Sequence, residues 1–420
     1  MKSVIVGAGS TYTPELIEGI ARRPELDVSD LVLVDIDRDR LDVVGGLATR
    51  MLEAAEYRGS VVLTDDIDAA VEGADFVLLQ LRVGGQAARL VDETLPLAFG
   101  CLGQETTGPG GFAKALRTVP VVLDIAERVR ERAASGAWII DFTNPVGIVT
   151  RSLLDAGHRA VGLCNVAIGF QRRLAALLTV EPHRLRVDQV GLNHLSWIRA
   201  VYVDEVDVLD ELLVTHGQEI ADEIEVPLAA LQTLHVIPSY YLHYYYCTDS
   251  ELERERIGPK RAEEVQAIEA ELLRMYRDPG LTTKPALLEQ RGGAFYSEAA
   301  AQLMSSLHAG TGDVQVVDVR NGTTLAGLAT DAVVEVPCRV DRDGAHPLPQ
   351  TPLAPELLGL VQANTAYEEL TIDAALSGDR VTAVKALLAN PLVRQWEIAE
   401  PLLDALLEAN RQHLPRFFPG

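Results

Sequence analysis

Short apolar runs alternate with helical patterns over the first 165 residues. Six nearly all-apolar runs are typical of parallel strands buried on both faces: SVIVG (3–7), LVLVD (31–35), SVVLT (60–64), DFVLLQL (75–81), WIIDF (138–142) and AVGLC (160–164). Between them, helical patterns include 15–23, 37–56 and 113–133. Because strands alternate with helices, the pattern predicts right-handed crossovers and a doubly wound parallel sheet.

The regular alternation of strand and helix patterns ends after about residue 170. We expect a helix over 168–178, a strand pair within 186–203, further helices to about residue 275 and antiparallel strands within 314–340. The tail from Pro355 carries apolar residues at helical spacing. The prediction is therefore an α/β protein with two domains: a Rossmann-like domain over 1–165, and a mixed α/β domain over 166–420 for substrate, metal and oligomerisation.

Composition and charge limit the kinds of molecule that the protein is expected to bind. The 420 residues carry a formal net charge of −24, which argues against a nucleic-acid or anionic-membrane partner. Apolar runs fall short of the roughly 20 residues of a membrane span, and the N-terminus lacks the apolar region of a signal peptide. The four cysteines form no CxxC pair. We therefore expect a cytoplasmic protein without a disulfide framework.

The segment VGAGSTYTPEL resembles the start of a dinucleotide-binding turn. Gly7 and Gly9 allow a tight turn and a close approach to a pyrophosphate, whose charge the next helix N-terminus stabilises. Tyr12 stands where the fingerprint has a third glycine, so the motif alone is a weak signal. Thr13 is the expected N-cap, with Pro14 at the first helical position.

Three further polar residues strengthen the case for a cofactor loop. Ser10 and Thr11 lie before the expected helix and add hydroxyl and backbone donors. Asp35 ends the second strand, where an acid binds the adenosine ribose, and its charge favours NAD over NADP. The alternative is that Asp35 only caps a turn.

Several polar residues follow the later strands or lie in glycine-rich loops. Cys164 and Asn165 end the sixth strand, at the sheet edge where ligands of open α/β folds bind, and Asn144 ends the fifth. Cys164 together with His194 offers ligands for a borderline divalent metal, although a lone Cys and a lone His are more often structural. Glu105 lies in GQETTGPGG without an evident structural role. Five tyrosines in SYYLHYYY (239–246) indicate a core or interface, or a phenol base near a metal.

The order of the motifs carries a resemblance to a known family. VGAGSTYTPEL, LVLVDID, GQETTGPGGFAKALR, DFTNPVGIVT, GLCNVAIGF, GLNHLSW, YYLHYYY and RGGAFYSEAA follow one another along most of the chain. Together they resemble the NAD- and metal-dependent family 4 glycoside hydrolases, most closely the 6-phospho-β-glucosidase members. This family is an exception to two-carboxylate glycoside hydrolysis.

The resemblance implies an elimination–addition mechanism. NAD takes the hydride from C3 of the sugar, and the resulting ketone acidifies the C2 proton, which a base removes. A divalent metal, typically Mn²⁺, stabilises the enediolate. The aglycone leaves from C1, water adds, and the hydride returns to C3, so that the cofactor is regenerated in each turnover.

The resemblance also implies roles for individual residues. Cys164 and His194 match the metal ligands, and Tyr241 matches the base that removes the C2 proton. Glu105 matches the acid that increases the basicity of this tyrosine. Positions that match substrate-binding residues are Arg89, Asn144 and Arg291. Arginine suits a phosphate because its planar fork bonds two oxygens.

Substrate preference depends on a few positions. Asn165 stands where the α-specific members have an Asp that protonates the leaving group, so the β-type substrate is favoured. Ala167 replaces the Pro of the usual CNVP, and His243 replaces the Arg of the usual YLRYY. If that Arg helps to hold the phosphate, His243 weakens or alters the preference for a phosphorylated glycoside.

Other functions remain open on the sequence alone. A family 4 glycosidase for unphosphorylated or α-linked glycosides is one alternative. A second is an NAD-dependent 2-hydroxy acid dehydrogenase of the lactate/malate type, which shares the architecture but has no role for Cys164, His194 and Tyr241. A third is an NAD-binding sensor without activity. The resemblance implies a homodimer or homotetramer.

Overall fold

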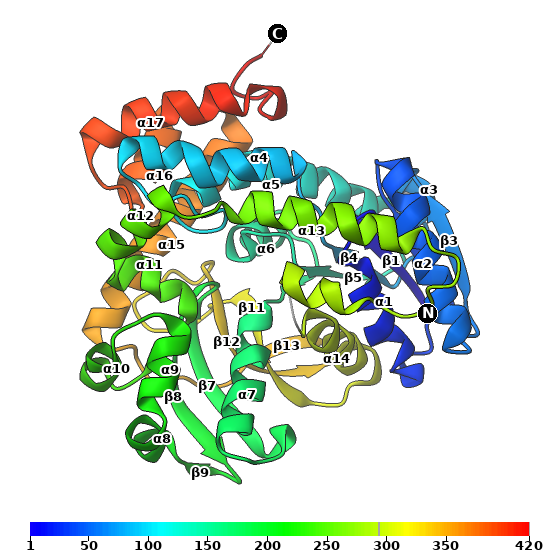
Figure 1. Ribbon diagram of the computed structural model, residues 1–420, viewed down its shortest axis with the longest axis horizontal. Helices are drawn as coiled ribbons and strands as arrows, with labels where there is room; N and C mark the ends of the chain where they lie inside the picture. Colours follow the sequence, from blue (N-terminus) through cyan, green and yellow to red (C-terminus); the bar gives the residue numbers. More distant parts are fainter. Residues whose placement is uncertain (293–294, 420) are drawn as a thin grey trace.

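The computed structural model describes residues 1–292 and 295–419; Gly293 and Ala294, within RGGAFYSEAA, and Gly420 lie outside the described residues. The strands of the described residues form one sheet of 13 strands. Its order is β10-β8-β7-β12-β11-β6-β5-β4-β1-β2-β3, with β13 beside β12 and β9 beside β8. In Figure 1 the parallel end of this sheet lies on the right and the antiparallel end at the lower left.

The parallel end confirms the doubly wound sheet. Its order, β3-β2-β1-β4-β5-β6, is typical of dinucleotide-binding folds. Alternate side chains face opposite layers: Ile5 and Leu33 pack with α1 and α2, whereas Val6 and Leu79 pack with α3 and α5. The strands are β1 (Lys2–Val6), β2 (Asp30–Val34), β3 (Ser60–Thr64), β4 (Phe76–Leu79), β5 (Trp138–Asp141) and β6 (Ala160–Gly162).

The helices between these strands match the predicted ones, with one correction at a helix start. They are α1 (Thr13–Ala21), α2 (Arg38–Ala54), α3 (Ile67–Val71), α4 (Gly85–Thr94), α5 (Gly108–Arg132) and α6 (Val146–Asp155). The prediction that Thr13 is the N-cap is wrong, because Tyr12 holds that position. The Thr13 hydroxyl instead donates to the Ala8 carbonyl at 2.9 Å, which fastens the loop to the helix.

The antiparallel end continues the same sheet. Asp318 of β11 pairs with Gly162 of β6, and Glu335 of β12 pairs with Gly191 of β7. The sheet therefore runs across residue 165, and the division into domains at this residue stays a prediction. The strands are β7 (Leu185–Leu192), β8 (Leu195–Val203), β9 (Val206–Asp207), β10 (Ile237–Pro238), β11 (Asp313–Arg320), β12 (Val333–Asp341) and β13 (Gly344–Pro347).

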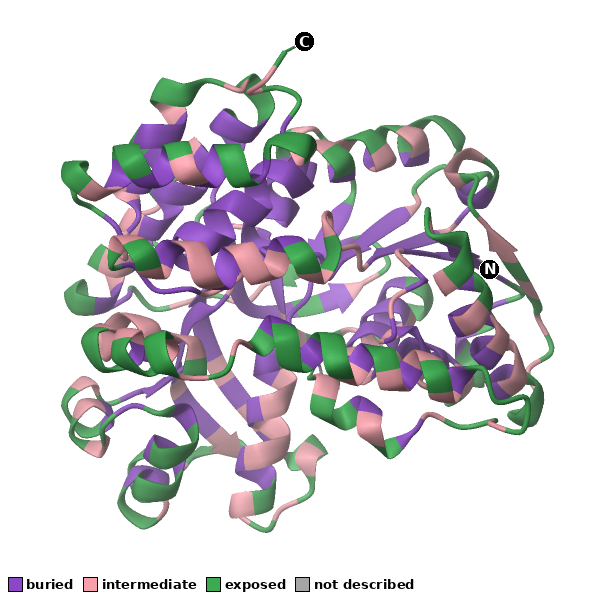
Figure 2. Cartoon of the chain, turned by 45° about the horizontal axis from the view of Figure 1, so that its top comes forward, coloured by how far each residue is buried: buried purple, intermediate pink, exposed green. Residues whose placement is uncertain are grey.

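Helices pack around the sheet, with buried residues on their inner faces and exposed residues on their outer faces (Figure 2). The C-terminal helices α15, α16 and α17 pack with α5 in a separate apolar cluster, and α13 lies along α4 and α2. No described helix is long and apolar enough to span a bilayer. The remaining helices are α7 (Asn165–Leu177), α8 (Leu209–Thr215), α9 (Gly217–Ile224), α10 (Leu228–Leu234), α11 (His243–Tyr246), α12 (Thr248–Ile257), α13 (Arg261–Tyr276), α14 (Tyr296–Ala309), α15 (Pro355–Ser377), α16 (Arg380–Ala389) and α17 (Trp396–Ala409).

Candidate active site

The glycine loop lies between β1 and α1, where the strand order reverses between β1 and β4. Gly7 has a φ of +85°, and a Cβ there would lie 3.0 Å from the Leu81 Cα and 3.1 Å from the Gln80 carbonyl group. Only glycine fits both the backbone conformation and the space. The glycine therefore lets the loop pass close to the residues after β4, at the crevice where such folds bind dinucleotides.

Asp35 holds this loop in place. Its Oδ2 accepts a hydrogen bond from the Gly9 amide at 2.8 Å, and its Oδ1 accepts one from the Asp37 amide at 2.9 Å. A Cβ on Gly9 would lie 2.9 Å from the Asp35 carboxyl carbon. The second glycine is thus required by its contact with Asp35. The ribose-binding role of Asp35 stays a prediction.

Ser10 and Thr11 turn the loop toward the helix. The Ser10 Oγ accepts from the Tyr12 amide at 3.2 Å, and an Arg291 Nη2 lies 3.5 Å from the same oxygen. Thr11 is fully buried, and its hydroxyl makes no hydrogen bond to a described residue. The Tyr276 hydroxyl donates to the Thr11 carbonyl at 2.7 Å. The loop is therefore fixed by residues distant in the sequence.

The two candidate metal ligands come from different ends of the sheet. Cys164 follows β6 and precedes α7, whereas His194 lies in the turn between β7 and β8 with a φ of +62°. Both are buried. The Tyr296 hydroxyl lies 3.9 Å from the Cys164 Sγ, and the His194 ring stacks on Tyr241 with ring centroids 3.7 Å apart. Each candidate ligand thus has a tyrosine beside it.

Burial sets the protonation states of these ligands in the protein. Burial, together with Lys114, lowers the pKa of His194 to about 3, so its imidazole is neutral and has a lone pair for a cation. Burial raises the pKa of the Cys164 thiol, and the Glu335 carboxyl acts in the same direction. A coordinated cation reverses that shift, because a metal-bound thiol loses its proton. The donor set therefore fits a borderline divalent metal.

Tyr241 lies in the short 3-10 helix Tyr240–Leu242 and is stacked between other rings. Its ring centroid is 4.7 Å from that of Tyr240, and its other neighbour is His194. Burial raises the pKa of the Tyr241 phenol well above its usual value; Tyr240, Cys164 and Glu105 add to this shift. The phenol is therefore neutral in the protein and becomes a strong base once a nearby cation assists its ionisation.

Glu105 lies among three cations. It forms ion pairs with Arg82, with Lys114 at 2.7 Å and with Arg89 at 3.3 Å. Burial raises the pKa of Glu105, but the three cations, led by Arg82, outweigh it and hold the pKa of this carboxyl well below its usual range. Glu105 is thus ionised, and its charge acts on Tyr241 in the direction that increases phenol basicity.

Of the residues predicted to bind substrate, the two arginines form ion pairs with acidic residues, and Asn144 has a buried side-chain oxygen. Arg89 binds Glu93 at 2.7 Å, and Arg291 binds Glu269 at 3.0 Å beside the cofactor loop. Asn144 follows β5, and its buried Oδ1 makes no hydrogen bond to a described residue. Asn165 begins α7 beside Cys164. Their roles toward a substrate stay predictions.

Sequence reasoning missed two residues of this site, Lys114 and Tyr296. Burial and Arg82 lower the pKa of Lys114 to about 7, so that it exchanges protons near neutral pH. Both residues lie within quoted motifs, GGFAKALR and AFYSEAA, but nothing in the spacing shows that they meet Glu105 and Cys164. A lysine within an apolar helical stretch was the one available signal.

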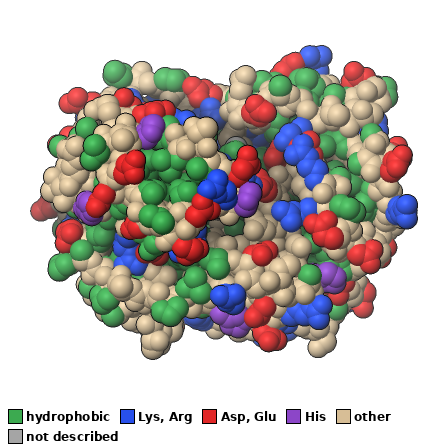
Figure 3. Space-filling view, turned by 90° about the horizontal axis from the view of Figure 1, so that it is seen from below, with side chains coloured by type: hydrophobic (Ala, Val, Ile, Leu, Met, Phe, Trp, Pro, Cys, Tyr) green, Lys and Arg blue, Asp and Glu red, His purple; other side chains and the backbone are tan. Residues whose placement is uncertain are grey.

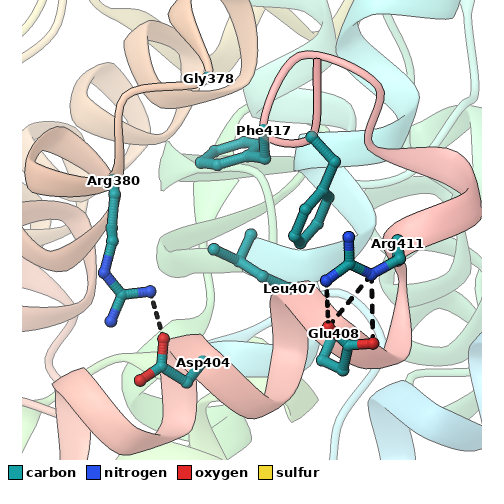
Figure 4. A pocket seen from close by; sticks show the side chains of 8 residues that line it. Gly378, Arg380, Asp404, Leu407, Glu408, Arg411 and Phe417 are labelled. Carbon is teal, nitrogen blue, oxygen red and sulfur yellow. Dashed lines mark hydrogen bonds and ion pairs between the residues drawn. The ribbon is translucent and has the colours of Figure 1, made fainter. Parts of the chain in front are cut away.

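Two cavities differ in their chemistry. A small one of about 30 Å³ is lined by His194, Asn193, Thr106 and Glu368, next to the site. A larger one of about 460 Å³ lies at the C-terminal helices (Figure 4). There the charged side chains are already paired, Arg380 with Asp404 and Arg411 with Glu408. On the face drawn in Figure 3, acidic and basic side chains lie interspersed, in keeping with a chain of net charge −24.

Comparison with solved structures supports the fold. A 6-phospho-β-glucosidase from Thermotoga maritima, solved with manganese, NAD⁺ and glucose 6-phosphate, matches with a TM-score of 0.92 at 34% identity, covering 98% of this chain and 99% of that chain. A lactate dehydrogenase from a deep-sea metagenome matches with a TM-score of 0.58 at 11% identity, covering 89% of this chain and 98% of that chain. The expected dehydrogenase-like architecture is confirmed.

Comparison with sequence families identifies the chain. The family 4 glycosyl hydrolase model matches residues 2–180, and the model of the family 4 glycosyl hydrolase C-terminal domain matches residues 189–393. A probable 6-phospho-β-glucosidase of Bacillus subtilis is 41% identical over 434 residues, covering 100% of this chain and 98% of that protein. The protein described here is a member of glycosyl hydrolase family 4.

Proposed function

We propose that this enzyme hydrolyses 6-phospho-β-glucosides with NAD and a divalent cation, most simply Mn²⁺. The observation that carries the proposal is the stacking of Tyr241 on His194, with centroids 3.7 Å apart, beside Cys164 and the ionised Glu105. This stacking supports the proposal that Tyr241 is the base beside the candidate metal ligands His194 and Cys164, with Glu105 as the acid that acts on it. The named activities of the Bacillus and Thermotoga relatives support the same substrate class.

The residues present fit both groups. Gly7 and Gly9 allow the tight loop that would receive the pyrophosphate, with Ser10 and Thr11 as donors and Asp35 for the ribose. Cys164 and His194 would hold the cation. When bound, NAD supplies a hydride acceptor for C3 of the sugar and the cation supplies a Lewis acid for the neighbouring oxygens.

Tyr241 performs the proton transfer in this proposal. Once ionised, its phenolate oxygen takes the proton from C2 of the sugar that carries the C3 ketone. The bond between C1 and the aglycone oxygen then breaks, and a proton from water completes the aglycone alcohol. Glu105 increases the basicity of the phenol through its negative charge. Lys114 pairs with the Glu105 carboxylate. Because its pKa is lowered to about 7, Lys114 exchanges its proton near neutral pH. Water then adds at C1 and Tyr241 returns the proton.

Asn165 and the arginines set the substrate preference. Asn165 begins α7 beside Cys164, and its amide is not an acid that could protonate an α-linked leaving group. Arg89 and Arg291 are our candidates for the 6-phosphate, which would compete with Glu93 and Glu269 for their guanidinium groups. Asn144 offers an unpaired buried oxygen to a sugar hydroxyl.

His243 bears on the phosphate requirement. Its Nε2 lies 3.7 Å from a carboxylate oxygen of Glu251, in α12. It lies 4.0 Å from a carboxylate oxygen of Glu225, the residue that follows α9. We therefore propose that phosphate recognition depends on Arg89 and Arg291 and is retained without an arginine at position 243. We also propose a homodimer or homotetramer in the cytoplasm, with domains over 1–165 and 166–420.

The test compares four p-nitrophenyl substrates at fixed NAD and Mn²⁺: the β- and α-glucosides, each with and without a 6-phosphate. The 6-phospho-β-glucoside is expected to have a kcat/KM about 100-fold or more above each of the others, since a bidentate charged contact contributes several kcal/mol. Equal rates for the phosphorylated and unphosphorylated β-glucosides would refute the phosphate assignment. A preference for the α-linked substrate would refute the role of Asn165.

A further inference from the structure

Outside the active site, His243 lies at a second cluster of ligand-type groups. His243 begins α11, Glu251 lies in α12, and Glu225 follows α9, and the three ligand atoms all lie within 4.8 Å of one another. The side chains of His243 and Glu251 are 9% and 8% exposed, whereas that of Glu225 is 47% exposed. The cluster is thus closed on the protein side and open to solvent at Glu225.

The hydrogen bonding of His243 directs a free nitrogen into this cluster. Its Nδ1 bonds the Tyr240 carbonyl, and because a carbonyl only accepts, Nδ1 carries the proton. The buried Nε2 makes no hydrogen bond to a described residue and lies 3.7 Å from a Glu251 oxygen and 4.0 Å from a Glu225 oxygen. A backbone carbonyl on the other ring nitrogen is the usual arrangement around a metal-binding histidine.

The carboxylates of the cluster offer oxygens to a cation. The His243 Nε2 faces one oxygen of Glu251 and one of Glu225, so a cation between these three atoms would be attracted to both carboxylates. Arg254 binds Glu225 at 2.6 Å and Glu251 at 2.7 Å, so one guanidinium faces two carboxylates. It uses the Glu251 Oε2 and leaves Oε1, the oxygen that faces His243. Arg254 also donates to the Glu225 Oε2 at 2.7 Å, so a cation would share Glu225 with Arg254 and take the Glu251 Oε1 for itself.

The spacing suits a small cation. Two ligands on a tetrahedral zinc lie about 3.4 Å apart, given metal–ligand bonds of about 2.1 Å. The observed 3.7 Å and 4.0 Å exceed this by a few tenths of an ångström, which side-chain rotation supplies. One imidazole and two carboxylates are a donor set that zinc accepts, with water at the fourth position.

We propose that His243, Glu251 and Glu225 form a second, structural divalent-cation site that takes Zn²⁺. The cation would join the end of α9 to the corner between α11 and α12. This corner follows Tyr241 directly, and on its far side the Glu255 carboxyl of α12 accepts from the Gly103 amide at 2.7 Å, two residues before Glu105. The site therefore stabilises two segments of the proposed active site without contacting substrate.

The test counts Zn²⁺ equivalents on the full-length chain after EDTA treatment, by isothermal titration with Zn²⁺ alone. His243→Asn is the main variant, because the asparagine amide nitrogen overlays Nδ1 and keeps the bond to Tyr240 while Nε2 is lost. His346→Asn is the matched control, since His346 pairs with Asp341 at 3.0 Å on the surface and belongs to no group of three ligand-type residues within 1–292 and 295–419. All three proteins also carry Cys164→Ser, which weakens the separate proposed catalytic metal site.

The expected result is that His243→Asn binds one equivalent fewer than its parent, and that His346→Asn binds the same number as the parent. Zn²⁺ should raise the melting temperature of the parent and of His346→Asn, and should raise that of His243→Asn less. Glu251→Gln should weaken the site at least about tenfold. Equal equivalents and equal thermal shifts in the parent and His243→Asn would overturn the proposal and leave His243 as an imidazolium paired with Glu251. Failure of the proposed glycosidase activity would leave this count unchanged.

Discussion

Asp141 offers a quantitative test of how the sheet edge is built. This carboxyl group ends β5 in complete burial, accepts from the Thr143 amide at 2.9 Å and accepts from the Thr150 hydroxyl at 3.2 Å. It thereby shapes the segment that leads to Asn144. Burial raises the pKa of Asp141 to about 8, because no cation is among the groups that act on it. The perturbation is Asp141→Asn, which mimics the protonated acid.

The magnitude follows from proton linkage. An exposed aspartate has a pKa of about 3.9, so between about pH 4 and pH 8 the folded state holds one proton that the unfolded state has lost. The free energy of unfolding then falls by about 1.4 kcal/mol for each unit of rising pH, and the fall ends above the folded pKa. Asparagine binds no proton, so the variant lacks this contribution.

The assay is equilibrium urea unfolding of the EDTA-treated protein at pH 6, 7 and 8. The wild type is expected to lose stability across this range more steeply than Asp141→Asn, by about 1.4 kcal/mol per pH unit. Asp379→Asn is the control, because this exposed N-cap of α16 has a lowered pKa and is ionised throughout the range. Equal slopes for the wild type and Asp141→Asn would refute the reasoning.

Three further variants test the site. Tyr241→Phe keeps the ring stacked on His194 but removes the base, so kcat should fall about 100-fold or more while NAD affinity measured by calorimetry is unchanged; full activity would reject Tyr241 as the base. Cys164→Ser should raise the Mn²⁺ concentration for half-maximal activity about tenfold or more, and an unchanged value would leave Cys164 structural. Gly7→Ala forces a side chain to within 3.0 Å of the Leu81 Cα at positive φ, so the Kd for NAD should rise about tenfold or more; unchanged binding would contradict the loop assignment.

The sequence predicted the strands and helices that a pattern of neighbouring residues is enough to specify. The strands of the parallel end, such as LVLVD, are buried on both faces and therefore show as apolar runs, and β2 lies at Asp30–Val34 as expected. The pairing of β6 with β11 joins Gly162 to Asp318, more than 150 residues apart. No local pattern specifies such a pairing, so the continuity of the sheet across residue 165 was not predicted.

The site could be predicted only in part, for a similar reason. The resemblance supplied Cys164, His194 and Tyr241, and in the structure His194 and Tyr241 are in contact. The hydrogen bond from the Gly9 amide to Asp35 depends on where two loops meet, and the sequence indicated only a ribose contact for this acid. Likewise, Lys114 reaches Glu105 because α5 begins next to the GQETTG loop.

The central claim is that the cofactor is used catalytically in glycoside hydrolysis. The most direct measurement follows nitrophenol and NADH together during incubation of the enzyme with p-nitrophenyl 6-phospho-β-glucoside, NAD and Mn²⁺. Our account predicts many nitrophenol molecules released for each NAD present, with no accumulation of NADH. Stoichiometric NADH without nitrophenol release would contradict it and favour a dehydrogenase.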